Sequence, residues 1–202
     1  MDLKRRQKMK KVIAVCEIVL GILMPVMAII GYFPEPELVV EFSCLSNVVT
    51  GIWLIIDGIL KLKGKKIPVR FFGNSCVGLF VVFAICMGSL TGAYHMNFKG
   101  AFMFLHVISP ILVMLFYIIF CDDSEGKAIF KLLLNPVFLM VYFLFDFILG
   151  KTRGYFVYGF FDALGFNILH ALIFGVVVYI LLFGVGGIFL LLNKIFHHKK
   201  TE

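Results

Sequence analysis

The chain has 202 residues, of which 61% are apolar and only 15% are charged, and its formal net charge is +7. Soluble domains are about 45–50% apolar and about 25% charged, so this composition excludes an ordinary water-soluble domain. The basic residues lie between long apolar runs, which indicates membrane topology rather than binding of nucleic acid.

Six apolar segments are long enough to cross a bilayer as helices, which takes about 20 residues each. Proline, glycine or charged residues separate one segment from the next. The predicted helices are 12–33, 38–62, 71–94, 101–120, 129–149 and 168–193. The sequence therefore predicts an all-α integral membrane protein, a bundle of six transmembrane helices that forms a single domain over residues 1–202.

The first apolar run follows a basic N-terminal segment, which is also the order found in a secretory signal peptide. The run extends over residues 12–30, which is long for the apolar part of a signal peptide, and no small-residue cleavage pattern follows it. We therefore expect a first membrane span that is retained.

Lysine and arginine are distributed unequally between the two sides of the predicted bundle. Sixteen lie in the N-terminal segment, in the loops around 61–70 and 127–131 and in the C-terminal tail, and three lie on the other side. Loops rich in lysine and arginine face the cytoplasm. We therefore expect a cell-membrane protein with both termini in the cytoplasm and with the acidic turn 34–37 outside.

Polar side chains within the predicted helices gather at one depth. On helix 38–62 they follow spacings of three, four and seven residues and so share one face. Its outer half holds Ser43, Ser46 and Asn47. The other helices contribute His106, Ser109, Asp146, Asn167 and His170 at a similar depth. Because polar groups inside a membrane are costly, this convergence predicts a polar pocket that opens toward the outer leaflet.

Each of these residues also has a purely structural interpretation. Serine in a membrane helix often donates to the carbonyl four residues earlier, and histidine or asparagine can join neighbouring helices. Asp146 can pair with Lys151 or Arg153 at the membrane interface. Both interpretations stay open from the sequence alone.

The remaining acidic residues of the spans are expected to support packing. Asp57 is four residues before Lys61, which predicts an ion pair along one helix. Glu17 and Glu41 are expected to face a partner helix or the membrane interface.

Metal and cofactor sites are not predicted. The five cysteines include no C-x-x-C pair, so we expect neither a disulfide framework nor a zinc site. Asp122, Asp123 and Glu125 resemble a metal-binding run but lack the spacing of an EF-hand loop. We therefore expect a solvated turn there, no metal and no cofactor.

Short motifs in matching order resemble the bacterial Pr6Pr family of membrane proteins. The stretch 42–47 resembles its F-T-x-x-S-N signature, and 106–110 resembles its H-x-x-x-P motif. Asn135-Pro136, followed by Tyr142, and the run 158–162 resemble later motifs of that family. The likeness covers residues 38–192.

That family is distantly similar to the eukaryotic androgen-induced membrane proteins, which are multi-pass hydrolases of fatty acid esters of hydroxy fatty acids. Those proteins are thought to use a threonine nucleophile in an early helix and a histidine in a later one. The resemblance implies that His106 matches the histidine and that Ser43 stands in place of the threonine. A shift of one residue in the alignment places Cys44 there instead.

These observations lead first to the hypothesis of an intramembrane hydrolase of lipid esters. Ser43 would attack the ester carbonyl and His106 would accept its proton. Asn47 or Ser46 would donate to the oxyanion, and Asp146 would orient an imidazole. Membrane lipids and an acyl ester are the partners that this hypothesis predicts, and nucleic acid is not among them.

Two other hypotheses use the same residues. The first is a transporter or small-molecule receptor with no bond cleavage, although the sequence shows neither paired broken helices nor repeated halves. The second is a scaffold that docks a partner protein, for which polar substitutions in the outer leaflet would have little effect.

Overall fold

The computed structural model describes residues 3–65, 70–89, 99–121, 123, 126–154, 156–157 and 168–198. These residues form helices joined by turns, and they contain no strand. The first half of the chain holds α1 (Leu3–Tyr32), the 3₁₀ turn η1 (Pro36–Val40), α2 (Phe42–Leu62) and α3 (Arg70–Ser89). The second half holds α4 (Gly100–Met103), the π-helical turn η2 (Phe104–Ile108), α5 (Ser109–Phe120), α6 (Ala128–Leu134), α7 (Val137–Arg153) and α9 (Ile168–His198).

Six helical stretches are long and apolar enough to cross a membrane, which confirms the predicted number of apolar helices within the described residues. They are Gln7–Tyr32, Phe42–Leu62, Phe71–Gly88, Gly100–Phe120, Ala128–Arg153 and Ile168–His197. The observed helix α1 begins well before the predicted start at residue 12, and residues 90–94 of the predicted third helix lie outside the described ranges. Residues 36–40 form a separate 3₁₀ turn rather than the start of α2.

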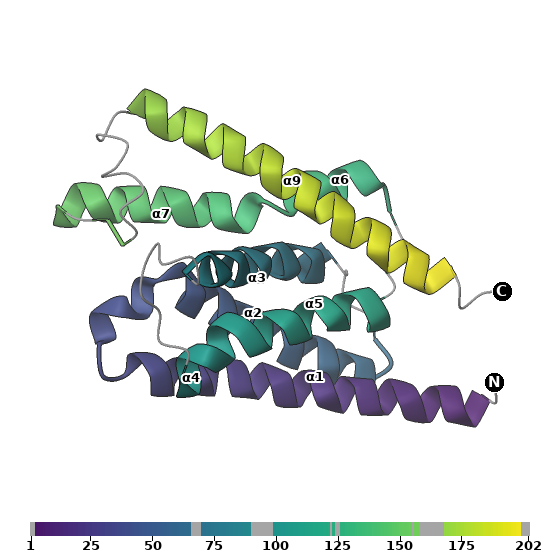
Figure 1. Ribbon diagram of the computed structural model, residues 1–202. Coiled ribbons are helices and arrows are strands. Elements are labelled where there is room, and N and C mark those ends of the chain that lie inside the picture. The colour runs from purple at the N-terminus through teal and green to yellow at the C-terminus, as the bar shows by residue number, and fades with distance from the viewer. Residues whose placement is uncertain are drawn as a thin grey trace.

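The helices lie in two parts of one bundle. Figure 1 shows α7 and α9 along one side of the group formed by α1, α2, α3 and α5. The start of α1 and the end of α9 lie at the same end, here termed the terminal end (Figure 1). The opposite end, with η1 and the starts of α2 and α4, is termed the distal end. Each long helix carries the chain from one end of the bundle to the other, so an even number of them returns the chain to the end at which it began.

Glycines allow α1 and α2 to pack closely. A Cβ atom on Gly51 would lie 2.7 Å from the carbonyl oxygen of Gly21 and 2.8 Å from Cδ of Pro25. One on Gly58 would lie 2.7 Å from the carbonyl oxygen of Ala14. Small residues at helix interfaces let two backbones approach in this way. The close contact fixes the register of α2 against α1 and so positions the polar residues of α2.

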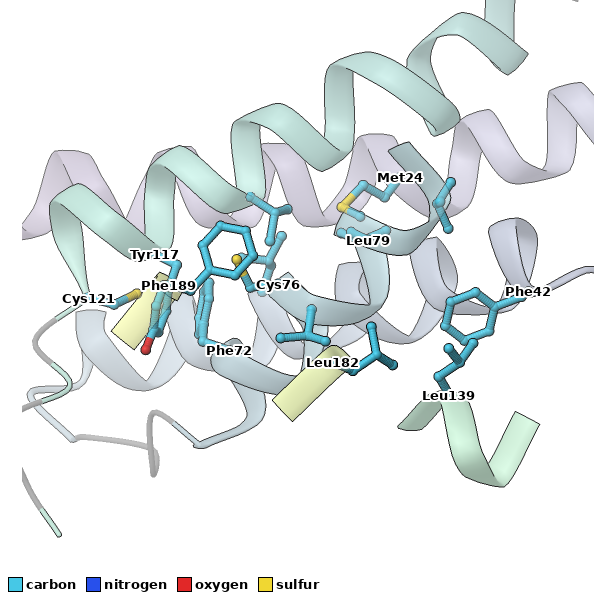
Figure 2. Close-up of a cluster of buried hydrophobic side chains, with 14 of the residues drawn as sticks. Met24, Phe42, Phe72, Cys76, Leu79, Tyr117, Cys121, Leu139, Leu182 and Phe189 are labelled. Carbon is cyan, nitrogen blue, oxygen red and sulfur yellow. The ribbon is translucent and has the colours of Figure 1, made fainter. Parts of the chain in front are cut away.

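A buried apolar cluster fills the space between the helices. Figure 2 shows its side chains, with Tyr117 of α5 beside Phe189 of α9, and with Met24 of α1 beside Leu79 of α3. The remaining face of α9 is apolar and exposed, as Ile180 and Leu181 illustrate at 62% each. A helix that is apolar on every face fits contact with lipid on its outer side.

The fifth membrane-length helix is interrupted at Asn135-Pro136, between α6 and α7. Asn135 is buried, and its side chain packs against two glycines on other helices. A Cβ on Gly73 would lie 2.9 Å from its Oδ1, and one on Gly186 would lie 2.6 Å from its Nδ2. The two glycines therefore make room for the amide at the break.

Candidate functional site

Three polar side chains meet at the distal end, where α1 ends and α2 begins. The hydroxyl of Ser43 lies 2.7 Å from the hydroxyl of Tyr32 and donates to Oε2 of Glu41 at 3.1 Å. The Tyr32 hydroxyl donates to the same carboxylate oxygen at 2.9 Å. Ser43 is 3% exposed and Tyr32 is 1% exposed. A buried serine hydroxyl is thus held between a phenol and a carboxylate.

The turn between α1 and α2 brings these residues together. Pro34 and Pro36 end the first helix, because proline cannot continue the backbone hydrogen bonds of a helix. The chain then reverses through η1, and the backbone N–H of Glu41 donates to Leu38 O at 2.9 Å. Glu41 has extended backbone angles immediately before Phe42, the first residue of α2. The turn therefore returns a carboxylate to the end of α1.

Burial is the main influence on the acidity of Glu41. It raises the pKa of that carboxyl above its ordinary value, because the charged form loses contact with water. The hydrogen bonds from Tyr32 and Ser43 lower the pKa and offset part of the increase, and the nearby charge of Glu35 raises it. A carboxylate with a raised pKa is a stronger base toward a hydroxyl than an exposed one.

Asn47 connects α2 to the π-helical turn η2. Its side-chain N–H groups donate to Ser43 O at 2.7 Å and to Leu105 O at 3.0 Å. Its side-chain oxygen accepts from Ser109 Oγ at 2.5 Å. Asn47 is 0% exposed. Since an amide nitrogen carries two hydrogens and both are engaged, Asn47 positions two backbones and has no hydrogen left for an oxyanion.

The π-helical turn has an identifiable cause in Pro110. The backbone N–H of Ser109 donates to Phe104 O, five residues earlier. In the same register the next donor would reach Leu105 O, but Pro110 has no N–H. Leu105 O accepts instead from Asn47 and, at 3.3 Å, from Ser109 Oγ. Isolated π-helical turns are frequent at functional sites, and this one carries His106.

His106 is buried and faces its own helix. Its Nδ1 lies 2.9 Å from Phe102 O. Its ring stacks on the Phe102 ring with their centroids 5.9 Å apart. The Phe102 ring also packs against the Tyr32 ring, with a centroid distance of 5.3 Å. Phe102 therefore contacts both His106 and the Tyr32 ring. The Nδ1 contact leaves Nε2 as the nitrogen that can exchange a proton with another molecule.

The structure joins four of the predicted residues and separates others. Ser43, Ser46, Asn47 and Ser109 share one hydrogen-bonded network, in which Ser46 Oγ makes a long contact of 3.4 Å with Ser43 O. Within the described residues, no hydrogen bond joins Ser43 to His106. The role of His106 as the base for Ser43 stays a prediction.

The other predicted site residues lie apart from this network or outside the description. Asp146 is buried on α7 and accepts the backbone N–H of Val157 at 2.8 Å. His170 is exposed on the first turn of α9, and Asn167 lies outside the described residues. Cys44, the alternative nucleophile, is buried in an apolar cluster with Ala28 and Leu105.

Sequence reasoning did not assign Tyr32 and Glu41 to the site. Glu41 was expected to face a helix or the interface, and its partner on α1 is indeed Tyr32. The available signal was its position two residues before Ser43, at the start of a helix with a polar face. The reversal through η1 could not be derived from that spacing.

A second polar network lies at the terminal end. Lys131 pairs with Asp123 Oδ1 at 2.8 Å, and Tyr117 donates to Asp123 Oδ2 at 2.7 Å. Asn193 of α9 donates to Tyr117 O at 2.7 Å and to Cys121 O at 2.6 Å. The prediction of a solvated turn is wrong for Asp123, which is 4% exposed. Its charge is balanced by Lys131, so Asp123 can be buried against Tyr117 of α5 and Asn193 of α9.

A third polar group lies between α1 and α2. The predicted pair of Asp57 and Lys61 is confirmed at 2.8 Å. Glu17 was expected to face either a partner helix or the membrane interface. It faces α2 and pairs with the same Lys61. Among the described residues, no three side chains of His, Cys, Asp or Glu gather as a metal site.

Fold and site together define an α-helical protein whose described residues include six membrane-length apolar helices and a buried polar network at the distal end. Comparison with protein-family models, with curated proteins and with solved structures finds no match for the chain. The resemblance to the Pr6Pr family therefore rests on the short motifs alone and stays a prediction.

Proposed function

We propose that the protein is a multi-pass cell-membrane hydrolase of lipid esters, with Ser43 as its nucleophile. The observation that carries this proposal is the hydrogen bond from Ser43 Oγ to Glu41 at 3.1 Å, with Tyr32 donating to the same carboxylate. A nucleophile beside a base that is oriented by a third group is the arrangement that activates a hydroxyl. The buried position favours a substrate that enters from lipid.

The geometry suggests a role for each residue. Ser43 Oγ attacks the acyl carbonyl carbon, and its proton moves to Glu41. The Tyr32 hydroxyl lies 2.7 Å from Ser43 Oγ and donates to Glu41 in the resting protein; once Glu41 is protonated, that hydrogen is released to the oxyanion that forms. As the tetrahedral intermediate collapses, the ester C–O bond breaks and Glu41 passes the proton it took from Ser43 to the alcohol that leaves. Nε2 of His106 then accepts a proton from the water that attacks the acyl-enzyme. The bond between Ser43 Oγ and the acyl group breaks, and the proton is returned to Ser43 Oγ as the fatty acid leaves. Asn47 holds Ser43 and the η2 turn at a fixed separation.

The proposed orientation places the distal end outside and both termini in the cytoplasm. Its support is the excess of lysine and arginine on the side of the termini, together with the location of both termini at one end (Figure 1). The site would then lie in the outer leaflet, with membrane lipids as partners and no role for nucleic acid.

Cysteine labelling tests the orientation. Glu35 and Lys65 are exposed at opposite ends of α1 and α2, and each can be replaced by cysteine. A membrane-impermeant maleimide applied to intact cells should label the Glu35→Cys variant, and should label the Lys65→Cys variant only after the cells are opened. Wild-type protein measures the background from the native cysteines, and the reverse pattern would invert the proposed topology.

A serine-directed fluorophosphonate tests the chemistry. Purified protein in lipid nanodiscs should become labelled, and the Ser43→Ala variant should not. The matched control is Cys44→Ala, which should be labelled like wild type and should still release fatty acid from a long-chain acyl ester. Equal labelling of Ser43→Ala and wild type contradicts the assignment of Ser43, and loss of hydrolysis only in Cys44→Ala transfers the role to the thiol.

A transporter is the second candidate, and the interrupted helices favour it. The fourth membrane-length helix contains the π-helical turn η2, and the fifth is broken at Asn135-Pro136. Discontinuous helices form the substrate sites of many transporters. Saturable uptake of an amphiphile into proteoliposomes, with no product formed, would support transport over hydrolysis.

A further inference from the structure

The group of Glu17, Asp57 and Lys61, here termed the inner triad, lies between α1 and α2 toward the terminal end. Lys61 Nζ contacts Glu17 Oε1 and lies 2.8 Å from Asp57 Oδ2. The side chain of Glu17 is 0% exposed, that of Asp57 is 9% exposed and that of Lys61 is 29% exposed. One ammonium group thus faces two carboxyl groups, of which that of Glu17 is fully buried.

The described surroundings supply no second cation. The ring centroids of Phe72 and Phe116 lie 5.7 and 5.9 Å from Lys61 Nζ. These rings interact with the positive charge of Lys61 and add no charge of their own. The Cys121 thiol is the other titratable neighbour, and burial raises its pKa, so it is neutral. Lys131, the next buried cation in the described chain, is paired with Asp123. Two ionised carboxylates would therefore leave the inner triad with one uncompensated negative charge.

The second oxygen of Glu17 identifies where that charge would lie. Oε2 of Glu17 is buried and has no hydrogen-bond partner. An anionic oxygen in this position is shielded from bulk water and has no donor among the described side chains, which is among the most costly arrangements in a protein interior. Asp57 differs, because it is partly exposed and only one turn from Lys61 on the same helix. A neutral carboxylic acid at Glu17 removes the charge and costs far less.

We propose that the inner triad is a binding site for a single proton, held on Oε2 of Glu17 in the resting protein. Bound in this way, the site is electrically neutral, with Lys61 and Asp57 as its ion pair. Lys61, at the edge of the site, separates Glu17 from water at the terminal end. The site is distinct from the group of Tyr32, Glu41 and Ser43 at the distal end and does not depend on ester hydrolysis.

Infrared spectroscopy of the full chain in lipid nanodiscs tests the proposal directly. A protonated carboxylic acid has a carbonyl stretch that is well separated from the bands of carboxylates. Wild type at neutral pH should show such a band, and the isosteric Glu17→Gln variant should lose it. The control is Glu37→Gln, since Glu37 is exposed in the distal turn and its removal should leave the band unchanged.

The Asp57→Asn variant separates charge balance from simple burial. With Asp57 neutral, Lys61 can pair with an ionised Glu17, so the acid band should weaken at neutral pH although Glu17 is still present. Persistence of the full band in Asp57→Asn would contradict the proposed charge balance. Circular dichroism of each variant checks that the helices are retained.

Two further results would overturn the proposal. Identical spectra of wild type and Glu17→Gln at neutral pH would show that Glu17 is ionised. Absence of the band, together with a melting temperature of wild type that rises in sodium but not in choline chloride, would assign the site to a metal cation.

Discussion

The hydroxyl groups of Tyr32 and Ser43 lie 2.7 Å apart, and both contact one oxygen of Glu41. The three residues come from the end of α1, the turn that follows it and the first turn of α2. The site is therefore built by one helical hairpin, whose register is set by the close contact of Gly21 and Gly51. The α4–α5 helix joins the hairpin through Asn47 and brings His106 beside it.

The reactivity of Ser43 should depend on pH through Glu41. The ionised carboxylate accepts the Ser43 proton, so fluorophosphonate labelling should rise as pH rises through the pKa of Glu41. Burial raises that pKa, and the Tyr32 hydrogen bond lowers it. Removal of the hydroxyl in Tyr32→Phe should therefore move the midpoint of labelling to higher pH.

The matched control for this shift is Tyr179→Phe. The Tyr179 hydroxyl donates to Leu133 O at 2.7 Å, on a different pair of helices. Labelling rates measured across a pH series should show the wild-type midpoint in this control. A midpoint in Tyr32→Phe that equals the wild-type value, or lies below it, would rule out Glu41 as the base.

The Asn47 amide should be worth more to stability than a typical polar group. Replacement by alanine removes three hydrogen bonds and leaves Leu105 O without its donor on α2. Unsatisfied buried groups cost about 1–3 kcal/mol each, so we expect a loss in that range or above it. Thermal unfolding in detergent, compared with Asn74→Ala, measures the effect.

Asn74 is a suitable reference because its side-chain oxygen has no hydrogen-bond partner. Truncation of Asn74 to alanine removes the same volume as truncation of Asn47 and breaks no hydrogen bond to that oxygen. If Asn47→Ala unfolds at the same temperature as Asn74→Ala, the amide does not hold α2 against η2. Labelling of Ser43 should fall in Asn47→Ala, since the Ser43 carbonyl loses its anchor.

The helical architecture followed from the sequence because apolar runs long enough to cross a membrane have few alternatives to a helix. Backbone groups in lipid must bond internally, so each long apolar run forms a helix. The polar face of α2 was also predictable, since its spacing alone placed Ser43, Asn47 and Asp57 together. All three are buried on α2 in the structure.

The partners of these residues could not be predicted in the same way. Contact between Tyr32 and Glu41 depends on the path of η1, and the burial of Lys131 depends on the position of Asp123. A sequence does not distinguish a lysine at the membrane surface from one paired inside. Pro110 was a signal for the π-helical turn, because its missing N–H frees one carbonyl near His106.

Alanine at Gly51 should disrupt the hairpin. Its Cβ would lie 2.7 Å from Gly21 O and 2.8 Å from Pro25 Cδ, so the two helices would have to separate. Overpacking of this kind costs about 1–3 kcal/mol, and Ser43 labelling should fall with it. Unfolding temperature in detergent and labelling yield are the two measurements.

Gly184→Ala provides the comparison for Gly51→Ala. Gly184 is also within a helix, and nothing lies within 4 Å of a Cβ placed on it. Because alanine favours a helix over glycine by about 0.8–1 kcal/mol, this variant should be as stable as wild type or slightly more so. Equal stability of the two variants would show that α1 and α2 are not in tight contact at Gly51.

The buried pair of Lys131 and Asp123 should be stabilising only while both partners are present. Lys131 is 5% exposed, and its replacement by methionine leaves the Asp123 carboxylate with Tyr117 but without a cation. Breaking a buried pair on one side costs roughly 3–5 kcal/mol. The exposed Lys127→Met change, four residues earlier, should stay within about 0.5 kcal/mol of wild type.

A double variant separates the lost attraction from the charge left behind. Asparagine at position 123 removes the negative charge and can still accept the Tyr117 hydroxyl, so Asp123→Asn combined with Lys131→Met should recover most of the lost stability. Unfolding by denaturing detergent measures all four proteins on one scale. If the double variant is as unstable as Lys131→Met alone, the uncompensated carboxylate is not the cause, and the loss comes from the packing of the lysine chain and its bond to Asp123 O.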